Sequence, residues 1–432
     1  MHTIPIPEGL QSHAFILGED VLCEVPQLLR ENFPGRRPWI VADGNTWAVA
    51  GERLQKMLVD EAMAPCTPHI FPAAPRLHPD YAFSQALAAE MPGDAVPVAV
   101  GSGVINDLTK CAAGLREVRY CCVATACSVD GYTSSGGAMS VNGTKKTVKC
   151  PAPYAICGDT RILATAPPEM LASGYADLLA KVPAGADWHI ADVMGQDPID
   201  PPVWQLIQVP LRRWIASPHD LGQVFNGLVA TGYGMQMKND SRPASGAEHL
   251  FSHIWEMEGL QFGGEDVSHG FKVGVGSVLS TLLLEFVRDH GFRELKAMTA
   301  PGLARLEREE EISQLLSRGC YGEGIPETAM RKFLEGEALA QRRAEIEANW
   351  ETMRSRIREQ LIPSDDLAKM LRAAGCPAAP QEIGLGKEQC LHAILAAQLM
   401  RIRYTVIDLL YELGLLRMVA GMAVEKVFSM AR

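Results

Sequence analysis

Residues 95–110 read AVPVAVGSGVINDLTK, and this stretch decides the fold class. The apolar run at 95–100 lies between Pro-Gly-Asp and Gly-Ser-Gly, which predicts a buried strand that turns sharply into a helix. Glycine allows close approach of a ligand to the backbone, and the first turn of a helix offers free N–H groups to a phosphate. The segment is not Gly-x-Gly-x-x-Gly, so a plain tight turn and a nucleotide site both remain open.

Two further apolar runs, 38–42 and 119–125, predict strands of the same sheet. Strands that alternate with helices favour a doubly wound parallel sheet. After about residue 167 helical patterns dominate. We therefore expect an α/β chain, with a Rossmann-like parallel-sheet domain at 1–165 and an all-helical domain at 166–432. The expected helices cover residues 47–60, 168–181, 202–216, 270–291, 305–316, 331–360 and 406–428, the last as one helix or a pair.

Composition excludes several classes of protein. The 432 residues are 47% apolar and 21% charged, with a formal net charge of −11 and no basic run. Nucleic acid is a poor candidate partner, because phosphate neutralisation needs clustered cations. The sequence has no apolar run long enough for a membrane span and no secretory layout at its N-terminus, which favours a cytoplasmic protein. Its eleven cysteines are scattered without a Cys-x-x-Cys pair, so we expect reduced, mostly buried thiols.

Polar side chains follow the predicted strands, where parallel sheets bind ligands. Asp43 ends the first strand, and its carboxylate either accepts hydrogen bonds from a ribose or only starts an Asp-Gly-Asn turn. The third strand runs into TACSVDGYTSSGG at 125–137, where small, polar and acidic groups are dense. Turn formation alone needs some of these residues, but the density is typical of a binding crevice.

Four residues form a candidate metal set. Asp177 lies in a helical stretch, His249 and His253 are four residues apart, and His269 follows sixteen residues later. Histidines four apart share one face of a helix, and one Asp with two or three His suits zinc, iron or nickel. A single helical histidine is more often structural. Glu248 precedes the first histidine, so this is not the His-Glu-x-x-His protease motif.

Taken in order, GSGVINDLTK, TACSVDGYTSS, DTRILATAPPEMLASGYADLLAK, SRPASGAEHLFSHIWEM and VSHG resemble the glycerol-1-phosphate dehydrogenase family. This family belongs to the 3-dehydroquinate synthase-like and iron-containing alcohol dehydrogenase superfamily. The resemblance covers about 38–280 and implies a dehydroquinate synthase-like fold with nucleotide and metal in a cleft between two domains. It implies Asp177, His249 and His269 as metal ligands, and Asp130 and His253 as substrate contacts. The implied contacts of NAD or NADP are Asp43, Gly101, Gly103, Asp107, Thr125, Ser128 and Ser134.

The resemblance implies a homo-oligomeric NAD(P)-linked dehydrogenase that needs one divalent metal (zinc, nickel or iron) and interconverts dihydroxyacetone phosphate and sn-glycerol 1-phosphate. Alternatives are a dehydrogenase of another polyol or phosphosugar, a 3-dehydroquinate synthase-like cyclase, and a non-catalytic binding protein. A phosphorylated substrate needs cations, for which Lys145, Lys146, Lys149 and Arg242 are the nearest in sequence, although each could be surface charge. Family members often carry proline where this chain has Cys127, and the last hundred or so residues carry no motif that we can map.

Overall fold

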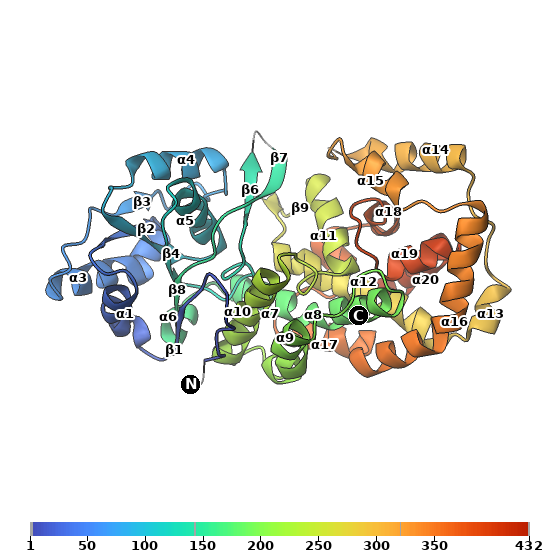
Figure 1. Cartoon of the computed structure of the whole chain (residues 1–432), viewed down its shortest axis with the longest axis horizontal. Helices are drawn as coiled ribbons and strands as arrows, with labels where there is room; N and C mark the ends of the chain where they lie inside the picture. The colour runs from blue at the N-terminus through green and yellow to red at the C-terminus, as the bar shows by residue number, and fades with distance from the viewer. Residues whose placement is uncertain (1–2, 142–143, 320, 431–432) are drawn as a thin grey trace. The chain divides into compact units, whose positions relative to one another are not determined.

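The computed structural model describes residues 3–141, 144–319 and 321–430. The chain forms two compact units, each made of two segments. The first consists of Met1–Leu178 and Val209–Asp240, and the second of Leu179–Gln208 and Ser241–Arg432. The ribbon in Figure 1 follows the chain through both units.

A six-stranded sheet organises the first unit, with every neighbouring pair of strands parallel. The strand order is β1-β8-β5-β4-β2-β3, so the chain crosses over between strands as a doubly wound sheet requires. The predicted parallel sheet is therefore confirmed. The strands are β1 (Ala14–Gly18), β2 (Arg37–Asp43), β3 (His69–Phe71), β4 (Ala95–Gly101), β5 (Cys121–Ala124) and β8 (Ala155–Asp159). A separate antiparallel hairpin is formed by β6 (Gly137–Val141) and β7 (Thr144–Val148).

Helices cover both faces of this sheet. Alternate residues of β4, such as Val96, Val98 and Val100, join one buried cluster with side chains of α1 and α3, because successive strand residues face opposite sides. The helices α4 and α5 pack together, and Figure 1 shows them on the other side of the sheet from α1 and α3. The helices of this part are α1 (Val25–Asn32), α2 (Gly44–Thr46), α3 (Glu52–Asp60), α4 (Tyr81–Glu90), α5 (Gly103–Leu115), α6 (Thr160–Leu163), α7 (Pro168–Leu179) and α10 (Leu221–Lys238).

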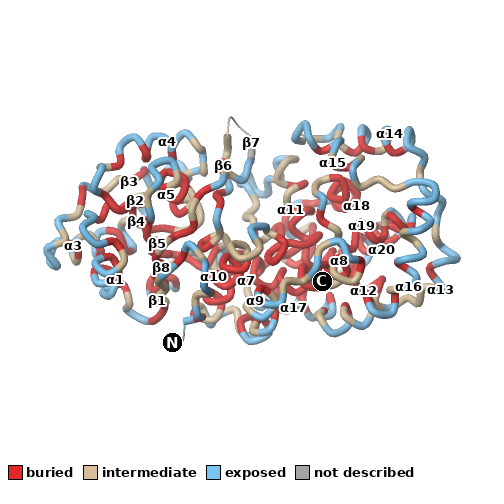
Figure 2. Tube along the Cα trace, in the orientation of Figure 1, coloured by how far each residue is buried: buried red, intermediate tan, exposed pale blue. Residues whose placement is uncertain are grey.

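The described residues of the second unit are helical or connecting segments, apart from the short hairpin of β9 (Gln261–Phe262) and β10 (Glu265–Asp266). Its central helix, α12 (His269–Asp289), is long and apolar enough to cross a membrane, but 94% of its most apolar window is buried within the protein, as in a core helix. Figure 2 shows α11 and α12 as largely buried. The other helices are α8 (Lys181–Val193), α9 (Pro201–Trp214), α11 (Ala247–Met257), α13 (Phe292–Lys296), α14 (Arg305–Leu315), α15 (Ile325–Arg331), α16 (Gly336–Gln360), α17 (Ser364–Ala373), α18 (Lys387–Ala397), α19 (Val406–Glu412) and α20 (Leu416–Ser429).

The prediction of one long helix at 331–360 was wrong about where the helix begins. The helix α15 ends at Arg331, and α16 begins at Gly336, where φ is +57°. That left-handed backbone suits glycine and separates the two helices. The predicted stretch at 168–181 is likewise divided, because α7 ends at Leu179 and α8 begins at Lys181.

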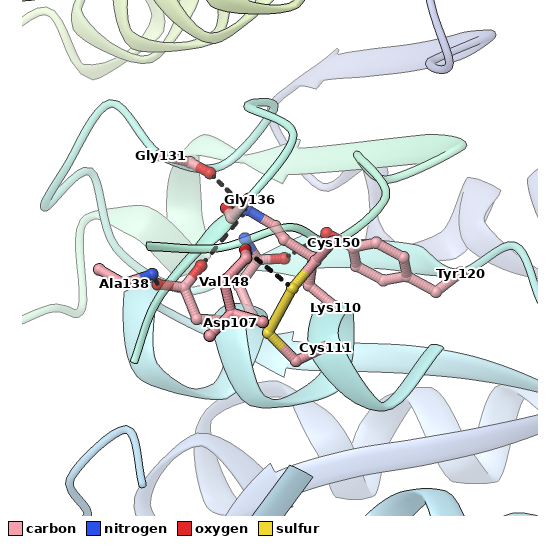
Figure 3. Close-up of a disulfide and its surroundings, with 10 residues drawn as sticks. Asp107, Lys110, Cys111, Tyr120, Gly131, Gly136, Ala138, Val148 and Cys150 are labelled. Carbon is pink, nitrogen blue, oxygen red and sulfur yellow. Dashed lines mark hydrogen bonds and ion pairs between the residues drawn. A yellow bond between two sulfur atoms is a disulfide. The ribbon is translucent and has the colours of Figure 1, made fainter. Parts of the chain in front are cut away.

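The expectation of unpaired thiols was wrong for one pair of cysteines. Cys111 on α5 and Cys150 after β7 form a disulfide, with a sequence separation of 39 and a Cα–Cα distance of 5.2 Å (Figure 3). The return of the β6–β7 hairpin brings the two together, which no local spacing indicates. The eight other cysteines in the described part of the chain take no part in this disulfide.

Replacing both Cys111 and Cys150 by serine should lower the free energy of unfolding of the oxidised protein. The cross-link closes a loop of about forty residues, and the chain-entropy relation assigns such a loop about 4 kcal/mol. Urea denaturation without reductant measures the difference. The same comparison in dithiothreitol is the control, since wild type and variant should then agree; equal stability under both conditions would contradict the prediction.

Candidate metal and nucleotide site

Three of the residues assigned to nucleotide binding lie at the carboxyl edge of the sheet. Asp43 ends β2, Gly101 ends β4, and Thr125 follows β5. The Thr125 N–H donates to the Gly101 carbonyl at 3.1 Å, which joins two of these strand ends directly. In open α/β sheets this edge is where ligands bind.

The glycines after β4 have a steric role. A Cβ on Gly101 would lie 2.5 Å from the Cβ of Ile105, so only glycine lets the first turn of α5 pack this closely against the strand. Ser102 is the N-cap residue of α5, and its side chain makes no capping hydrogen bond. The first N–H groups of this helix are therefore not capped by that side chain and suit an anion. At Gly103 a Cβ would meet Val129 at 3.4 Å, which is ordinary contact.

Asp43 forms the turn that its sequence context suggested. Its Oδ1 accepts a hydrogen bond from the Thr46 N–H at 2.8 Å. The Thr46 hydroxyl in turn accepts one from the Asp43 N–H at 3.0 Å, so the two residues form a capping box. The same carboxylate lies at the sheet edge, so the turn reading is confirmed and the ribose contact stays a prediction.

Asp107 and Lys110 join α5 to the loop that follows β5 (Figure 3). The Lys110 ammonium is fully buried and donates to the carbonyls of Gly131 and Gly136 at 2.9 and 3.1 Å. The Asp107 carboxylate lies 3.3 Å from it and accepts from the Ala138 N–H at 3.2 Å. Burial raises the pKa of Asp107, although Lys110 acts in the opposite direction. This pair therefore fixes the loop to the helix.

The serines of this loop make contacts within it. Ser128 is buried, and its hydroxyl lies 3.4 Å from that of Tyr132. The Ser134 hydroxyl donates to the Gly131 carbonyl at 3.1 Å. The loop is thus held in one conformation beside the Gly-Ser-Gly turn, as a binding loop needs to be.

The three residues expected to bind metal come together. Asp177, His249 and His269 each offer one ligand atom, and these atoms lie within 4.8 Å of one another. Asp177 is fully buried and His249 is 5% exposed. Two imidazole nitrogens and a carboxylate oxygen are a donor set that fits zinc, nickel or iron and leaves further coordination positions for a substrate.

Two carboxylates orient the candidate ligand histidines. The Nδ1 atom of His249 lies 2.7 Å from Glu248 Oε1, and Nδ1 of His269 lies 3.2 Å from Glu256 Oε1. A proton on Nδ1 that is donated to a carboxylate leaves Nε2 as the lone-pair donor, which is how metal-binding histidines are usually held. This arrangement is the strongest sign that the cluster is a metal site and not three core side chains.

Asp177 is positioned by the loop after β5. The Asp130 N–H donates to Asp177 Oδ2 at 2.9 Å. Gly174, one turn earlier on α7, lies so close to this loop that a Cβ there would be 1.8 Å from the Cys127 carbonyl oxygen. Helix and loop are therefore packed backbone to backbone beside the candidate ligand.

His253 lies next to this cluster but outside the group of three. Its ring centroid is 6.5 Å from that of His249 and 6.3 Å from that of His269. Its Nδ1 lies 3.4 Å from Glu256 Oε2. Burial lowers the pKa of His253 to about 4, although Glu256 acts in the opposite direction. Burial also acts to raise the pKa of Glu256, but hydrogen bonds from His253 and His269 bring it below its ordinary value.

Of the cations that the sequence suggested for a phosphate, Arg242 is engaged within the fold. Arg242 is 1% exposed, and its guanidinium donates to the carbonyls of Asp187 and Tyr404 at 2.7 and 3.0 Å, so it braces the fold. Lys146 and Lys149 are exposed, and the side chain of Lys145 lies outside the described residues.

Two other cations lie close to the histidines. Lys272 pairs with Glu256 at 3.0 Å, and the charge of Arg401 lowers the pKa of His253. The half-buried Arg401 also bonds to the Ser241 hydroxyl at 3.3 Å. Sequence reasoning missed both cations and both carboxylates. Lys272 is three residues after His269, a helical spacing that could have indicated it, whereas Arg401 is far away in sequence and gave no signal.

Known proteins resemble this chain in sequence and in fold. Residues 16–167 match the sequence profile of a family described as iron-containing alcohol dehydrogenase. Solved structures share the fold at low identity. A glycerol dehydrogenase from Schizosaccharomyces pombe has a TM-score of 0.58 at 14% identity, covering 97% of this chain and 89% of that one. A probable glycerol dehydrogenase from Sinorhizobium meliloti has a TM-score of 0.57 at 15% identity, covering 98% of each chain.

The curated relatives are more similar in sequence. A Bacillus subtilis glycerol-1-phosphate dehydrogenase [NAD(P)+] is 30% identical over 393 residues, which cover 86% of this chain and 84% of the relative. The enzyme of the same name from Geobacillus thermodenitrificans is 35% identical over 249 residues, and that match spans 55% of this chain and 61% of the relative. An archaeal namesake from Methanoculleus marisnigri is 28% identical, over 70% of this chain and 84% of its own. The chain belongs to the glycerol-1-phosphate dehydrogenase family.

Proposed function

We propose that this protein is a metal-dependent, NAD(P)-linked dehydrogenase that interconverts dihydroxyacetone phosphate and sn-glycerol 1-phosphate. The observation that carries the proposal is the group of Asp177, His249 and His269, with each histidine Nδ1 held by a carboxylate. The names of the relatives support the substrate and the cofactor.

In this proposal Asp177, His249 and His269 hold one divalent ion. When bound, the ion supplies Lewis acidity toward an alcohol or ketone oxygen, and the nicotinamide exchanges the hydride. Glu248 and Glu256 keep the two imidazoles in the tautomer that presents Nε2. His253 donates its Nδ1 proton to Glu256, which leaves its Nε2 to accept a hydrogen bond from a substrate hydroxyl.

The first part of the chain, residues 1–165, would bind the nucleotide, and residues 166–432 would bind metal and substrate. The strand-end residues Asp43, Gly101 and Thr125 support the first assignment, together with the uncapped start of α5 at Gly103. The remaining proposed nucleotide contacts are Asp107, Ser128 and Ser134, and Asp130 would contact the substrate. A cytoplasmic homo-oligomer belongs to the same proposal, and light scattering after size-exclusion chromatography measures its assembly.

We assign the substrate phosphate to Arg401, with Lys272 nearby. Lys272 pairs with Glu256 at 3.0 Å, and the charge of Arg401 lowers the pKa of His253. Both cations therefore act on groups at or beside His253 and His269. A guanidinium binds a phosphate through two parallel hydrogen bonds, which suits Arg401 to that role. Lys272 is engaged by Glu256 and would add mainly positive potential.

The reaction is tested by the absorbance of NADH with chelated enzyme and dihydroxyacetone phosphate, to which zinc, nickel or ferrous iron is returned separately. Oxidation of NADH that depends on the returned metal supports the proposal and identifies the effective ion. NADPH in place of NADH tests the cofactor preference. No turnover with any metal or either cofactor would overturn the assignment of reaction and substrate.

His249→Ala should abolish metal retention and turnover while the protein stays folded, because it removes one of three ligand side chains. Metal content after desalting, initial rates and the thermal unfolding midpoint measure the three properties. His219→Ala is the matched control, since His219 is exposed and far from the cluster in sequence. Full activity in a verified metal-free His249→Ala protein would contradict the proposal.

Glu256→Gln should weaken metal binding about 10–100-fold, as losses of hydrogen-bond partners to metal-binding histidines generally do. The amide keeps the shape of the side chain but removes the charge that faces His253, His269 and Lys272. Competition with a chromogenic chelator gives the affinity. Glu258→Gln is the control, because Glu258 pairs with His392 at 3.0 Å and not with a candidate ligand; equal losses in both variants would count against the role of Glu256.

Arg401→Gln should raise KM for dihydroxyacetone phosphate about 10–100-fold, since a hydrogen bond to a charged group contributes about 1.5–3 kcal/mol. The kcat value should change less, and the rate with unphosphorylated dihydroxyacetone should hardly change. Arg358→Gln, at an exposed position on α16, serves as the control. An equal effect on both substrates would show that Arg401 does not bind the phosphate.

A further inference from the structure

The second unit contains a pocket that the proposed reaction does not use. Its volume is about 430 Å³, within the range of small-molecule sites. It is lined by parts of α14, α15, α16, α18, α19 and α20 and by connecting segments that include residues 300–303. None of the proposed metal, substrate or nucleotide residues is among those that line it.

Three cations project into this pocket from largely buried positions. Arg308 is 1% exposed, bonds to Glu311 and Gln398 at 2.7 and 2.6 Å, and lies 4.4 Å above the ring of Tyr411. Its Nε has no hydrogen-bond partner among the described groups. A buried donor without a partner is costly, so this nitrogen is a candidate contact for a ligand.

The other two cations are paired with acids. Lys332 lies 2.7 Å from Asp408, and Arg342 lies 3.3 Å from Glu412. Burying such pairs gains little stability over apolar side chains of similar size. Charged groups that are retained around an open pocket are therefore better explained by recognition than by stability.

The rim of the pocket adds positive charge that is not neutralised. Arg331 and Arg417 line the pocket, are exposed, and have no ion pair among the described residues. Counting side chains, five cations and four acids line the pocket. Burial raises the pKa of one of those acids, Glu412, to about 7, which weakens its negative charge near neutral pH. The pocket thus favours an anion.

The walls also define the size and polarity of the occupant. Phe333, Leu334 and Leu339 supply an apolar surface, and Tyr404 and Tyr411 supply aromatic rings. Guanidinium groups bind carboxylate and phosphate oxygens in pairs. The fitting occupant is a small organic molecule that carries a phosphate or carboxylate.

The pocket is linked to the start of helix α11, which carries His249. Tyr404 lines the pocket, and its carbonyl accepts from Arg242 at 3.0 Å. The neighbouring Arg403 donates to the Ser245 carbonyl at 2.9 Å, two residues before α11 begins. Buried Asp187 accepts from the N–H groups that start α11 and α19, at Ala247 and Val406, at 2.8 and 2.7 Å.

We propose that this pocket is an effector site for a small organic phosphate or carboxylate, and that its occupation changes how firmly the metal is held. The inference is independent of which substrate the enzyme reduces. Coupling between two sites is reciprocal at equilibrium, so an occupant that raises the affinity for the metal must bind the metal-loaded protein more tightly than the metal-free protein.

The binding experiment uses 3-phosphoglycerate, which carries both anionic groups and no ketone. Isothermal titration is done on the full chain carrying His249→Ala and Arg401→Gln, in which the proposed substrate site is disabled. One-to-one binding is expected, weakened at least tenfold when Arg331→Gln and Arg417→Gln are added. Arg358→Gln is the matched control, and unchanged thermal midpoints verify folding. Inorganic phosphate in a parallel titration separates recognition of a free anion from recognition of the organic molecule.

Absence of binding, or binding that is indifferent to Arg331→Gln and Arg417→Gln, overturns the proposed site, whatever the enzyme assay gives. The coupling has its own readout, the rate at which metal passes from the wild-type holoenzyme to a chelator. With 3-phosphoglycerate this rate should change at least threefold in the wild-type protein and stay constant in the Arg331→Gln, Arg417→Gln protein. An unchanged rate in the wild type overturns the coupling.

Discussion

An imidazole can bind a metal through only one of its two nitrogens, and the rest of the site depends on how the other is held. In this protein Glu248 faces Nδ1 of His249, and Glu256 faces Nδ1 of His269. Glu256 also faces His253 and Lys272, so a single carboxylate sets the orientation of two rings and one ammonium. Burying that charge is favourable only because these partners surround it. The helices α11 and α12 therefore have to pack in the one register that brings them together.

The sequence was sufficient for the fold class because its strongest signals are local. Apolar runs at 38–42, 95–100 and 119–125 became β2, β4 and β5 of a parallel sheet, and the helical second half followed from its periodicity. The strand β3, which has only three residues, was missed, and so were β1 and β8. Both are five residues long, and β1 is an edge strand that is only partly buried, so neither has a distinctive pattern. Their pairing joins segments more than a hundred residues apart, which no local window detects.

In the candidate site, the metal ligands were predictable from the sequence, whereas the side chains that hold them were not. Asp177, His249 and His269 come together as the ordered motifs implied, because each motif places its residue on a helix. Their partners were not predictable in this way, since an acid on an amphipathic helix resembles ordinary solvated charge until the opposite helix is known. Arg242 shows the reverse error. It is near the histidines in sequence, yet its guanidinium donates hydrogen bonds to the backbone carbonyls of Asp187 and Tyr404.

The contact at Gly174 has a consequence for how this chain can vary. The helix α7 meets the carbonyl of Cys127 where even a methyl group would overlap, and Asp177 follows one turn later. Any side chain at position 174 would push helix and loop apart and move the carboxylate away from the Asp130 N–H. The distance between α7 and the loop therefore depends on position 174 having only a hydrogen atom in place of a side chain. In a library of random variants, this position should be as intolerant as the ligands themselves, although glycine contributes no chemistry of its own.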